Sequence, residues 1–342
     1  MVSERGLEVL RVIVQDYVAS REPVGSKSIV ERHAFGVSAA TIRNDMALLE
    51  DEELITAPHT SSGRVPTDKG YRVFVDQPTE LRPLSTAQRQ AIETFVGQSV
   101  GLDDVLARTV RLLSQLTHQV ALVQYPSLAS SKVRHIELVP LTATRLMTVF
   151  ITDSGRIEQR LIDVTGVLDD VFLADLRAKL NAGLGGLGLS DAAAKLSTFP
   201  QQFSLQRRPL VEQVTTSLVE QVMANRQDRL VMAGAANLAR TEEDFSGSIF
   251  PVLEAIEEQV TLLRLFGEME VEHSGSGVAV SIGKENANFG LGQTSVLTSG
   301  YSSSGGSVAR LGVLGPTRMD YSNNMAAVRA VARYLSRLLG ED

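Results

Sequence analysis

The sequence predicts an α+β fold of several domains, and three observations support this prediction. Residues 1–77 contain capped helical segments and a short hairpin that is rich in turn residues. Residues 120–163 and 277–314 carry β-rich runs separated by turn signals, which is typical of antiparallel strands. The stretch between these two regions is dominated by helical patterns. With 342 residues, the chain has room for two or three domains with cores of their own.

A helix is expected to begin after Ser38, whose hydroxyl can accept a hydrogen bond from a free amide of the first turn. Ile42, Met46 and Leu49 share one face of this helix and are candidates for the core. Small and polar residues occupy the other face: Ala40, Thr41, Arg43, Asn44 and Ala47. Arginine and asparagine can bond to guanine and adenine edges, so this face predicts a DNA recognition helix. The alternative is an ordinary solvated helix face.

The flanking segments favour the recognition helix. Upstream, residues 27–33 have a short helical pattern, followed by a turn that contains Gly36, as helix-turn-helix motifs do. Downstream, two short apolar runs flank a tip at residues 58–63, which is rich in turn residues and in small donors that suit phosphate oxygens. Thr67 then caps a helical segment that reaches residue 76. With an amphipathic helix over residues 3–20, residues 1–77 are predicted to form a winged helix-turn-helix domain.

The composition limits the possible functions. The chain has no cysteine, which excludes disulfides and thiolate metal sites and fits a reducing compartment. It shows no signal sequence and no apolar run of membrane-spanning length, so we expect a cytoplasmic protein without a membrane partner. The net charge of -7 argues against a broad surface for nucleic acid. Specific DNA binding would therefore depend on an uneven distribution of charge.

The remaining domains are predicted from the order of strand and helix signals. Residues 78–118 are expected to form linker helices. Residues 119–165 and 250–342 are expected to form one antiparallel-sheet domain from two segments, and residues 166–249 a mostly helical domain inserted between them. Within the insertion, an apolar stripe is either a dimer seam or the inner face of a core helix; its members are Val211, Val214, Leu218 and Val222. Residues 252–266 are expected to form one further helix.

No pattern for enzymatic chemistry is found. The five histidines are scattered without metal-ligand spacing, so no metal site is expected. Gly183, Gly185 and Gly188 match the spacing of a dinucleotide-binding loop, but a helical pattern precedes them where a strand is required. No serine completes a nucleophile elbow. We therefore expect neither an enzyme nor a bound cofactor.

Two polar pairs lie beside expected strand ends. They are Glu285 with Asn286 and Arg318 with Asp320. An effector could bind there, but anchoring of loops is the commoner use of such residues and is the favoured interpretation.

Two groups of residues together resemble one known family. Residues 38–76, SAATIRNDMALLEDEELITAPHTSSGRVPTDKGYRVFVD, are similar to the N-terminal module of the HrcA family of bacterial heat-inducible transcription repressors. The tracts IGKEN (282–286) and GVLGPTRMDY (312–321) resemble later motifs of the same family. The resemblance extends over nearly the whole chain and is weakest between residues 166 and 225.

The resemblance implies a repressor of heat-shock chaperone operons that binds an inverted-repeat operator, CIRCE, as a homodimer. It also implies a GAF-like central domain, an inserted dimerising domain, and an activity linked to the GroEL chaperonin. Carried over by position, base contacts belong to Thr41, Arg43 and Asn44, with Ala40 beside them; the outer helix face indicates the same three. Contacts with the DNA backbone belong to Ser26, Lys27, Ser38, Ser61, Ser62 and Arg64.

Other functions compete with this one. A small-molecule-responsive winged-helix regulator would hold a ligand in the central sheet domain, in a pocket lined by polar groups. An enzyme that carries a winged helix would need a nucleophile, a metal site or an acid pair, and none has recognisable spacing. A winged helix that joins proteins would show an aromatic patch, which the face around Arg43 and Asn44 lacks.

Overall fold

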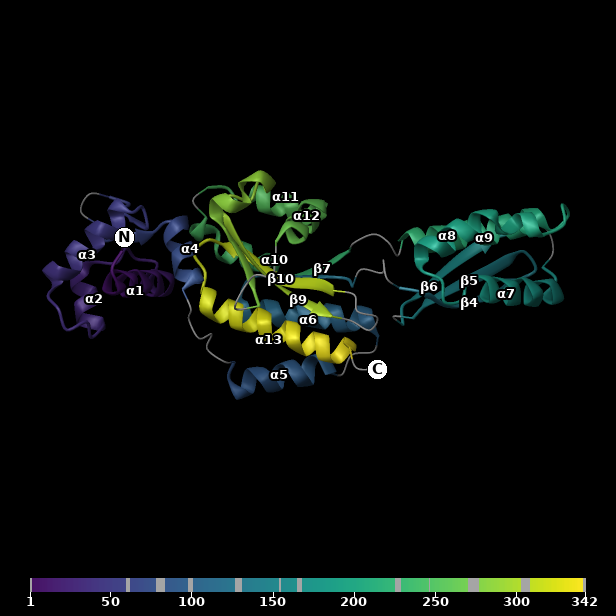
Figure 1. Cartoon of the computed structure of the whole chain (residues 1–342), viewed down its shortest axis with the longest axis horizontal. Helices are drawn as coiled ribbons and strands as arrows, with labels where there is room; N and C mark the ends of the chain where they lie inside the picture. The colour runs from purple at the N-terminus through teal and green to yellow at the C-terminus, as the bar shows by residue number, and fades with distance from the viewer. Residues whose placement is uncertain are drawn as a thin grey trace.

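The computed structural model describes residues 2–59, 62–77, 84–97, 101–126, 131–153, 155–164, 168–224, 229–245, 247–269, 277–302 and 308–340. The molecule is elongated and has three bodies in a row (Figure 1). The N-terminal helices form one end, a five-stranded sheet with its helices lies in the middle, and a three-stranded sheet with its helices forms the other end. Helices combined with antiparallel sheets confirm the predicted α+β class.

The N-terminal body combines helices with a short hairpin. Its elements are α1 (Glu4–Ser20), α2 (Ser26–Arg32), α3 (Ala39–Asp51), β1 (Ile55–Thr56), β2 (Val65–Pro66) and α4 (Asp68–Asp76). Ser38 caps α3 by accepting a hydrogen bond from the Thr41 amide at 3.2 Å, as its position predicts. Thr67 caps α4 in the same way. Gly36 lies in the turn between α2 and α3 with φ +66°, a conformation that favours glycine.

The middle body is a sheet with helices on both faces. Its strand order is β7-β3-β10-β9-β8, and all neighbours are antiparallel. The strands are β3 (Val120–Gln124), β7 (Leu230–Ala233), β8 (Ala279–Ile282), β9 (Thr294–Ser302) and β10 (Val308–Pro316). The helices are α5 (Thr86–Gly97), α6 (Leu102–Thr117), α10 (Ala235–Arg240), α11 (Phe250–Glu258), α12 (Val260–Glu268) and α13 (Tyr321–Gly340), with 3-10 turns η3 (Glu242–Asp244) and η4 (Gly283–Phe289).

The two faces of this sheet have separate cores. Ala121 and Val123 of β3 pack with α6 and α13, whereas Val120 and Leu122 pack on the side of α11 and α12. Figure 1 shows α6, α13 and α5 on one side of the sheet and α11 and α12 on the other. Since both faces are covered, β3 is a continuous apolar run instead of an alternating one.

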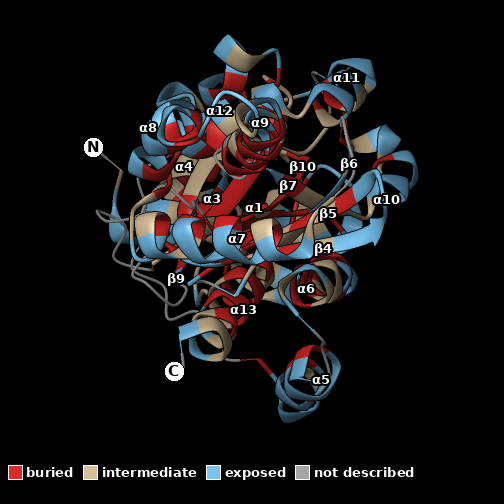
Figure 2. Cartoon of the chain, turned by 90° about the vertical axis from the view of Figure 1, so that its right-hand side faces the viewer, coloured by how far each residue is buried: buried red, intermediate tan, exposed pale blue. Residues whose placement is uncertain are grey.

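The third body is an insertion between β3 and β7. It contains β4 (Val133–Thr142), β5 (Arg145–Thr152), β6 (Ile157–Asp163), α7 (Asp170–Leu184), α8 (Leu189–Thr198), η2 (Phe199–Gln202) and α9 (Arg208–Ala224). The strands form a separate sheet of order β4-β5-β6, and the helices pack against one face of it. Figure 2 views this end of the molecule and shows α7 with its outer side exposed and its inner side buried.

The strand grouping corrects the predicted single sheet. Of the strands in residues 119–165, only β3 joins the strands that follow residue 277; β4, β5 and β6 belong to the insertion. β7, which lies within residues 166–249, pairs with β3 and belongs to the middle body. The physical reason is visible in the patterns, because β5 alternates between buried and half-buried residues whereas β3 is buried on both faces.

Two helix predictions also require correction. Val211, Val214, Leu218 and Val222 are all fully buried in the core of the insertion, so they form the inner face of a core helix and are not available as a dimer seam. The single helix expected over residues 252–266 is divided into α11 and α12 at Gln259, whose φ of +55° interrupts helical geometry.

Candidate nucleic-acid interface

The outer face of α3 is exposed at the free end of the molecule (Figure 1). Arg43 and Asn44 project from it, and Ala40 and Ala47 are exposed beside them. The opposite face is buried in the core with α1 and α2; its residues are Ile42, Met46 and Leu49. Packing on one side therefore fixes the direction in which Arg43 and Asn44 point.

Thr41 is half-buried and has a local partner. Its Oγ1 lies 3.1 Å from Oγ of Ser38, the residue that caps the helix. Ser38 is exposed at the start of α3, and Lys27 is exposed in the first turn of α2, with Ser26 half-buried next to it. These residues lie at the N-termini of α2 and α3, where the helix dipoles favour anions.

The hairpin lies next to the far end of α3. Ile55 pairs with Pro66, and Thr56 pairs with Val65. Ser62 closes the tip, because its hydroxyl donates to the His59 carbonyl at 2.7 Å and accepts from the His59 amide at 3.0 Å. Ser61 lies outside the described residues.

Two acidic residues of α3 are paired with arginines, and a third, Asp51, is exposed at the end of the helix. Asp45 is buried and accepts two hydrogen bonds from the Arg5 guanidinium, at 2.7 and 3.0 Å. Glu50 pairs with Arg64, whose Nη2 lies 2.8 Å from the carboxylate. Arg64 is therefore held beside α3 by Glu50. In its first three turns, the outer face of α3 therefore carries the positive charge of Arg43, on a chain of net charge -7.

Side chains of α4 attach the N-terminal body to the middle body. Arg72 donates from Nε and Nη2 to the two carboxylate oxygens of Glu285, at 2.9 and 2.7 Å. Asp68 accepts a hydrogen bond from the Lys284 amide at 3.0 Å. Asn286 is fully buried and donates to the Thr294 carbonyl at 2.9 Å, which fixes the loop that presents Glu285. The IGKEN tract thus serves as an anchor.

A second anchor joins the end of α1 to the middle body. Arg318 pairs with Asp244 at 2.6 and 3.1 Å, and both side chains are nearly buried, at 11% and 5% exposure. The same guanidinium donates to the carbonyls of Val18 and Tyr17 at 2.6 and 3.2 Å. Arg21 also reaches Asp244, at 3.0 Å. We call the residues Asp68, Arg72, Asp244, Glu285 and Arg318 the interdomain clasp.

Two buried tyrosines fill the space between the anchors. The rings of Tyr71 and Tyr321 lie 5.4 Å apart, and the Tyr321 hydroxyl donates to the Thr317 carbonyl at 2.7 Å. Burial raises the pKa of both phenols above the ordinary value, so both stay neutral at physiological pH. The contact between the bodies is thus apolar at its centre and ionic at its edges.

The sheet of the insertion leaves one face open. Pairing places Val139, Met147 and Leu161 side by side across the three strands, and Ile151 next to Ile157. The exposed fractions are 57% for Ile157 and 56% for Leu161. We call this surface the open sheet face and define it as Val139, Met147, Val149, Ile151, Ile157 and Leu161.

Residues 103–325 match the family model described as HrcA protein C terminal domain. A relative from Clavibacter michiganensis subsp. michiganensis, named heat-inducible transcription repressor HrcA, is 72% identical over 341 residues and is matched over 100% of both chains. This chain belongs to the HrcA family. An HrcA relative of the same name from Leifsonia xyli subsp. xyli is 67% identical over 341 residues, again over 100% of both chains.

Membership of the HrcA family makes the chain a transcription repressor and not an enzyme. A crystal structure described as that of a hypothetical protein shares the architecture, with a TM-score of 0.67, 25% identity and coverage of 99% of both chains. Among the described residues, no helix is long and apolar enough to cross a bilayer. The same part of the chain holds no cluster of three side chains suited to a metal ion.

The periodicity of the HrcA sequence did not indicate some residues of α3 and of the interdomain clasp. Leu48 is 56% exposed on α3, one turn after Asn44, and an exposed leucine on a polar face is the signal that could have marked it. Asp45 has polar character but faces inward, because Arg5 of α1 reaches it. In the interdomain clasp, no pattern in the neighbouring sequence marks Arg72 or Asp244 as a member of an ion pair.

Proposed function

We propose that this chain represses heat-shock chaperone operons in the cytoplasm by binding the inverted-repeat operator CIRCE as a homodimer. The observation that carries the proposal is the exposed pair Arg43 and Asn44 on the outer face of α3. A helix with this face fits the major groove, where arginine recognises guanine and asparagine recognises adenine. The N-terminal body is then a winged helix-turn-helix domain, with β1 and β2 as the wing, and the middle body is the GAF-like domain.

The other contacts are assigned by position. Ala40 lets the helix approach the bases, and Thr41 offers its methyl group, because its hydroxyl bonds to Ser38. Contacts with the DNA backbone are assigned to Ser26, Lys27, Ser38, Ser61, Ser62 and Arg64. The helix N-termini at α2 and α3 supply amide groups and positive partial charge for phosphates.

The dimer surface in this proposal is the open sheet face of the insertion. An apolar patch of this kind is unfavourable in water and is typical of an interaction site. A two-fold dimer covers it with the same face of a second copy. Such a dimer carries two copies of α3, which matches the two half-sites of an inverted repeat.

The proposal also includes the link to the GroEL chaperonin that the family resemblance implies. If only a fraction of the molecules is competent to bind, the apparent operator affinity falls by that fraction. A chaperonin that raises this fraction restores repression, and heat-damaged proteins that occupy the chaperonin relieve it.

A gel-shift titration tests the function. The full chain is titrated onto a duplex that bears the inverted repeat and onto a scrambled duplex of equal length, over a series of salt concentrations, with and without chaperonin after a mild heat pulse. We expect a preference for the repeat that persists as salt rises, and better recovery with chaperonin. Equal binding of both duplexes under all conditions would remove the operator from the proposal, and equal recovery would remove the chaperonin.

A further inference from the structure

We propose that Leu48 is a further specificity residue of α3 and that it contacts the C5-methyl group of a thymine in the operator. The inference rests on the proposed function, because it requires the outer face of α3 to enter the major groove. Leu48 is 56% exposed. It follows Asn44 by four residues, which places the two side chains on the same side of the helix, at the free end of the molecule (Figure 1).

The neighbours of Leu48 on the outer face of α3 are also turned toward solvent. Arg43, Asn44 and Ala47 are exposed, whereas Leu49 is fully buried in the core of the N-terminal body. Leu48 therefore extends the stripe of residues that the proposed function places against the bases. Ala47 beside it is small, so it does not hold the helix away from the bases.

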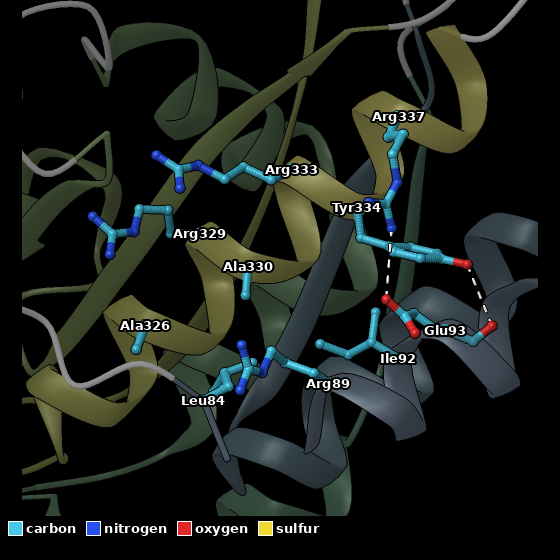
Figure 3. A pocket seen from close by; sticks show the side chains of 10 residues that line it. All are labelled: Leu84, Arg89, Ile92, Glu93, Ala326, Arg329, Ala330, Arg333, Tyr334 and Arg337. Atoms are coloured by element: carbon cyan, nitrogen blue, oxygen red, sulfur yellow. Dashed lines mark hydrogen bonds and ion pairs between the residues drawn. The ribbon is translucent and has the colours of Figure 1, made fainter. Parts of the chain in front are cut away.

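The exposure of Leu48 contrasts with that of apolar side chains that the chain itself covers. In the groove between α5 and α13, Leu84 and Ile92 are only 7% and 3% exposed, although several arginines line the same groove (Figure 3). Single exposed leucines are common on protein surfaces, and Leu48 is distinguished by its position among the residues assigned to base contacts. An apolar group of the DNA that covered Leu48 would remove its surface from water and so favour binding.

The chemistry of the major groove selects the base. The groove presents one methyl group, the C5-methyl of thymine, and otherwise mainly hydrogen-bond donors and acceptors. A leucine side chain has neither a donor nor an acceptor, so a polar base edge that faced Leu48 would lose its water without gaining a partner. Thymine is therefore the base that fits opposite Leu48.

The spacing along α3 predicts where this thymine lies. Four residues advance an α-helix by about 6 Å, and successive base pairs are about 3.4 Å apart. The thymine should therefore lie within about two base pairs of the base that Asn44 contacts. Base contacts should end with Leu48, because Asp51 is exposed on the following turn and its carboxylate repels phosphate.

Removal of single methyl groups from the operator tests the contact. Each thymine in one half-site of the inverted repeat is replaced in turn by deoxyuridine, which lacks the methyl group and keeps the hydrogen-bonding edge. Competition gel shifts with the full chain measure the affinity for each duplex. We expect one position at which the replacement weakens binding about two- to fivefold, which corresponds to the loss of one buried methyl group.

The variant Leu48→Ala identifies the side chain that contacts the methyl group. It should bind the thymine and deoxyuridine duplexes equally at that position, because the contact is already lost, and keep the sensitivity of the unaltered chain at the other positions. The matched control is Leu205→Ala, which shortens a leucine that is 79% exposed in the insertion and should keep the full discrimination. Circular dichroism should be unchanged in both variants, since neither leucine is buried.

The outcomes separate this inference from the proposed function. If the unaltered chain prefers the inverted repeat but no thymine position becomes insensitive in Leu48→Ala, the thymine contact is wrong and the repressor function stands. Equal weakening of the repeat and of a scrambled duplex by Leu48→Ala would assign the side chain to the DNA backbone and overturn the inference. If the unaltered chain shows no preference for the repeat, both the inference and the proposed function fail.

Discussion

Adjacent residues of α3 point in opposite directions, toward solvent and toward the core. Arg43 and Asn44 are exposed, whereas Asp45 is buried at 4% exposure and bound to Arg5. A free carboxylate next to the outer face of α3 would repel phosphate, and a buried one would be costly without a partner. The ion pair removes both difficulties and also ties α3 to α1.

At this scale, Arg43→Ala should weaken binding to the operator by about 1 to 3 kcal/mol and relax the preference at one base position. Arg64→Ala should instead weaken binding to all sequences alike and reduce the salt dependence, because a backbone contact is lost and Glu50 loses its partner. Competition gel shifts with single-base operator variants measure both effects. Unchanged base preference in Arg43→Ala would contradict the role of α3 as the recognition helix.

At the scale of elements, the two sheets differ in how they are covered. The five-stranded sheet has helices on both faces, whereas the helices of the insertion cover one face of β4, β5 and β6. Leu161 on the open sheet face is 56% exposed, while Val211 of α9 is fully buried. A partner surface is therefore expected on the strands and not on α9.

Leu161→Arg should convert the proposed dimer into a monomer. A two-fold interface would bury the new charge twice without a partner, which should raise the dimer dissociation constant by at least about a hundredfold. The matched control is Leu205→Arg, at a loop position that is 79% exposed, which should leave the dimer intact. Light scattering over a dilution series measures the mass. A dimer that persists in Leu161→Arg would place the interface elsewhere.

At the scale of the whole molecule, the interdomain clasp sets the orientation of the N-terminal body. It joins residues that are far apart in the sequence, since Arg72 reaches Glu285 and Arg318 reaches the end of α1. The pair of Arg318 with Asp244 is nearly buried, and the pair of Arg72 with Glu285 is more exposed. The first pair should therefore contribute more to stability, because solvent screens the second.

Arg318→Ala should lower the free energy of unfolding by about 3 kcal/mol, because among the described residues Asp244 then keeps only the partly exposed Arg21 as an ionic partner. The control is Arg145→Ala, which removes an exposed pair with Asp163 and should cost at most about 1 kcal/mol. Urea denaturation followed by circular dichroism measures both. Equal losses in the two variants would show that the clasp has no special role in stability.

Local signals predicted much of the N-terminal body. Ser38 and Thr67 cap the helices that they were expected to cap, and Ile42, Met46 and Leu49 face the core. Such features depend on residues within one or two turns of each other, which the sequence displays directly. The runs that became β3 to β6 and β8 to β10 were likewise recognisable as strands, whereas β7 lies in a region that was predicted to be mostly helical.

The sequence by itself determined most of the helices and strands, which face of α3 is polar, and to which family the chain is similar. Only the tertiary structure decided that β3 and β4 belong to different sheets, that Val211 and Leu218 face a core, and that Arg72 and Arg318 join two bodies. Periodicity reports that a residue is buried but not against what, because the partner of a buried face lies far away in the sequence and is selected by packing of the whole chain.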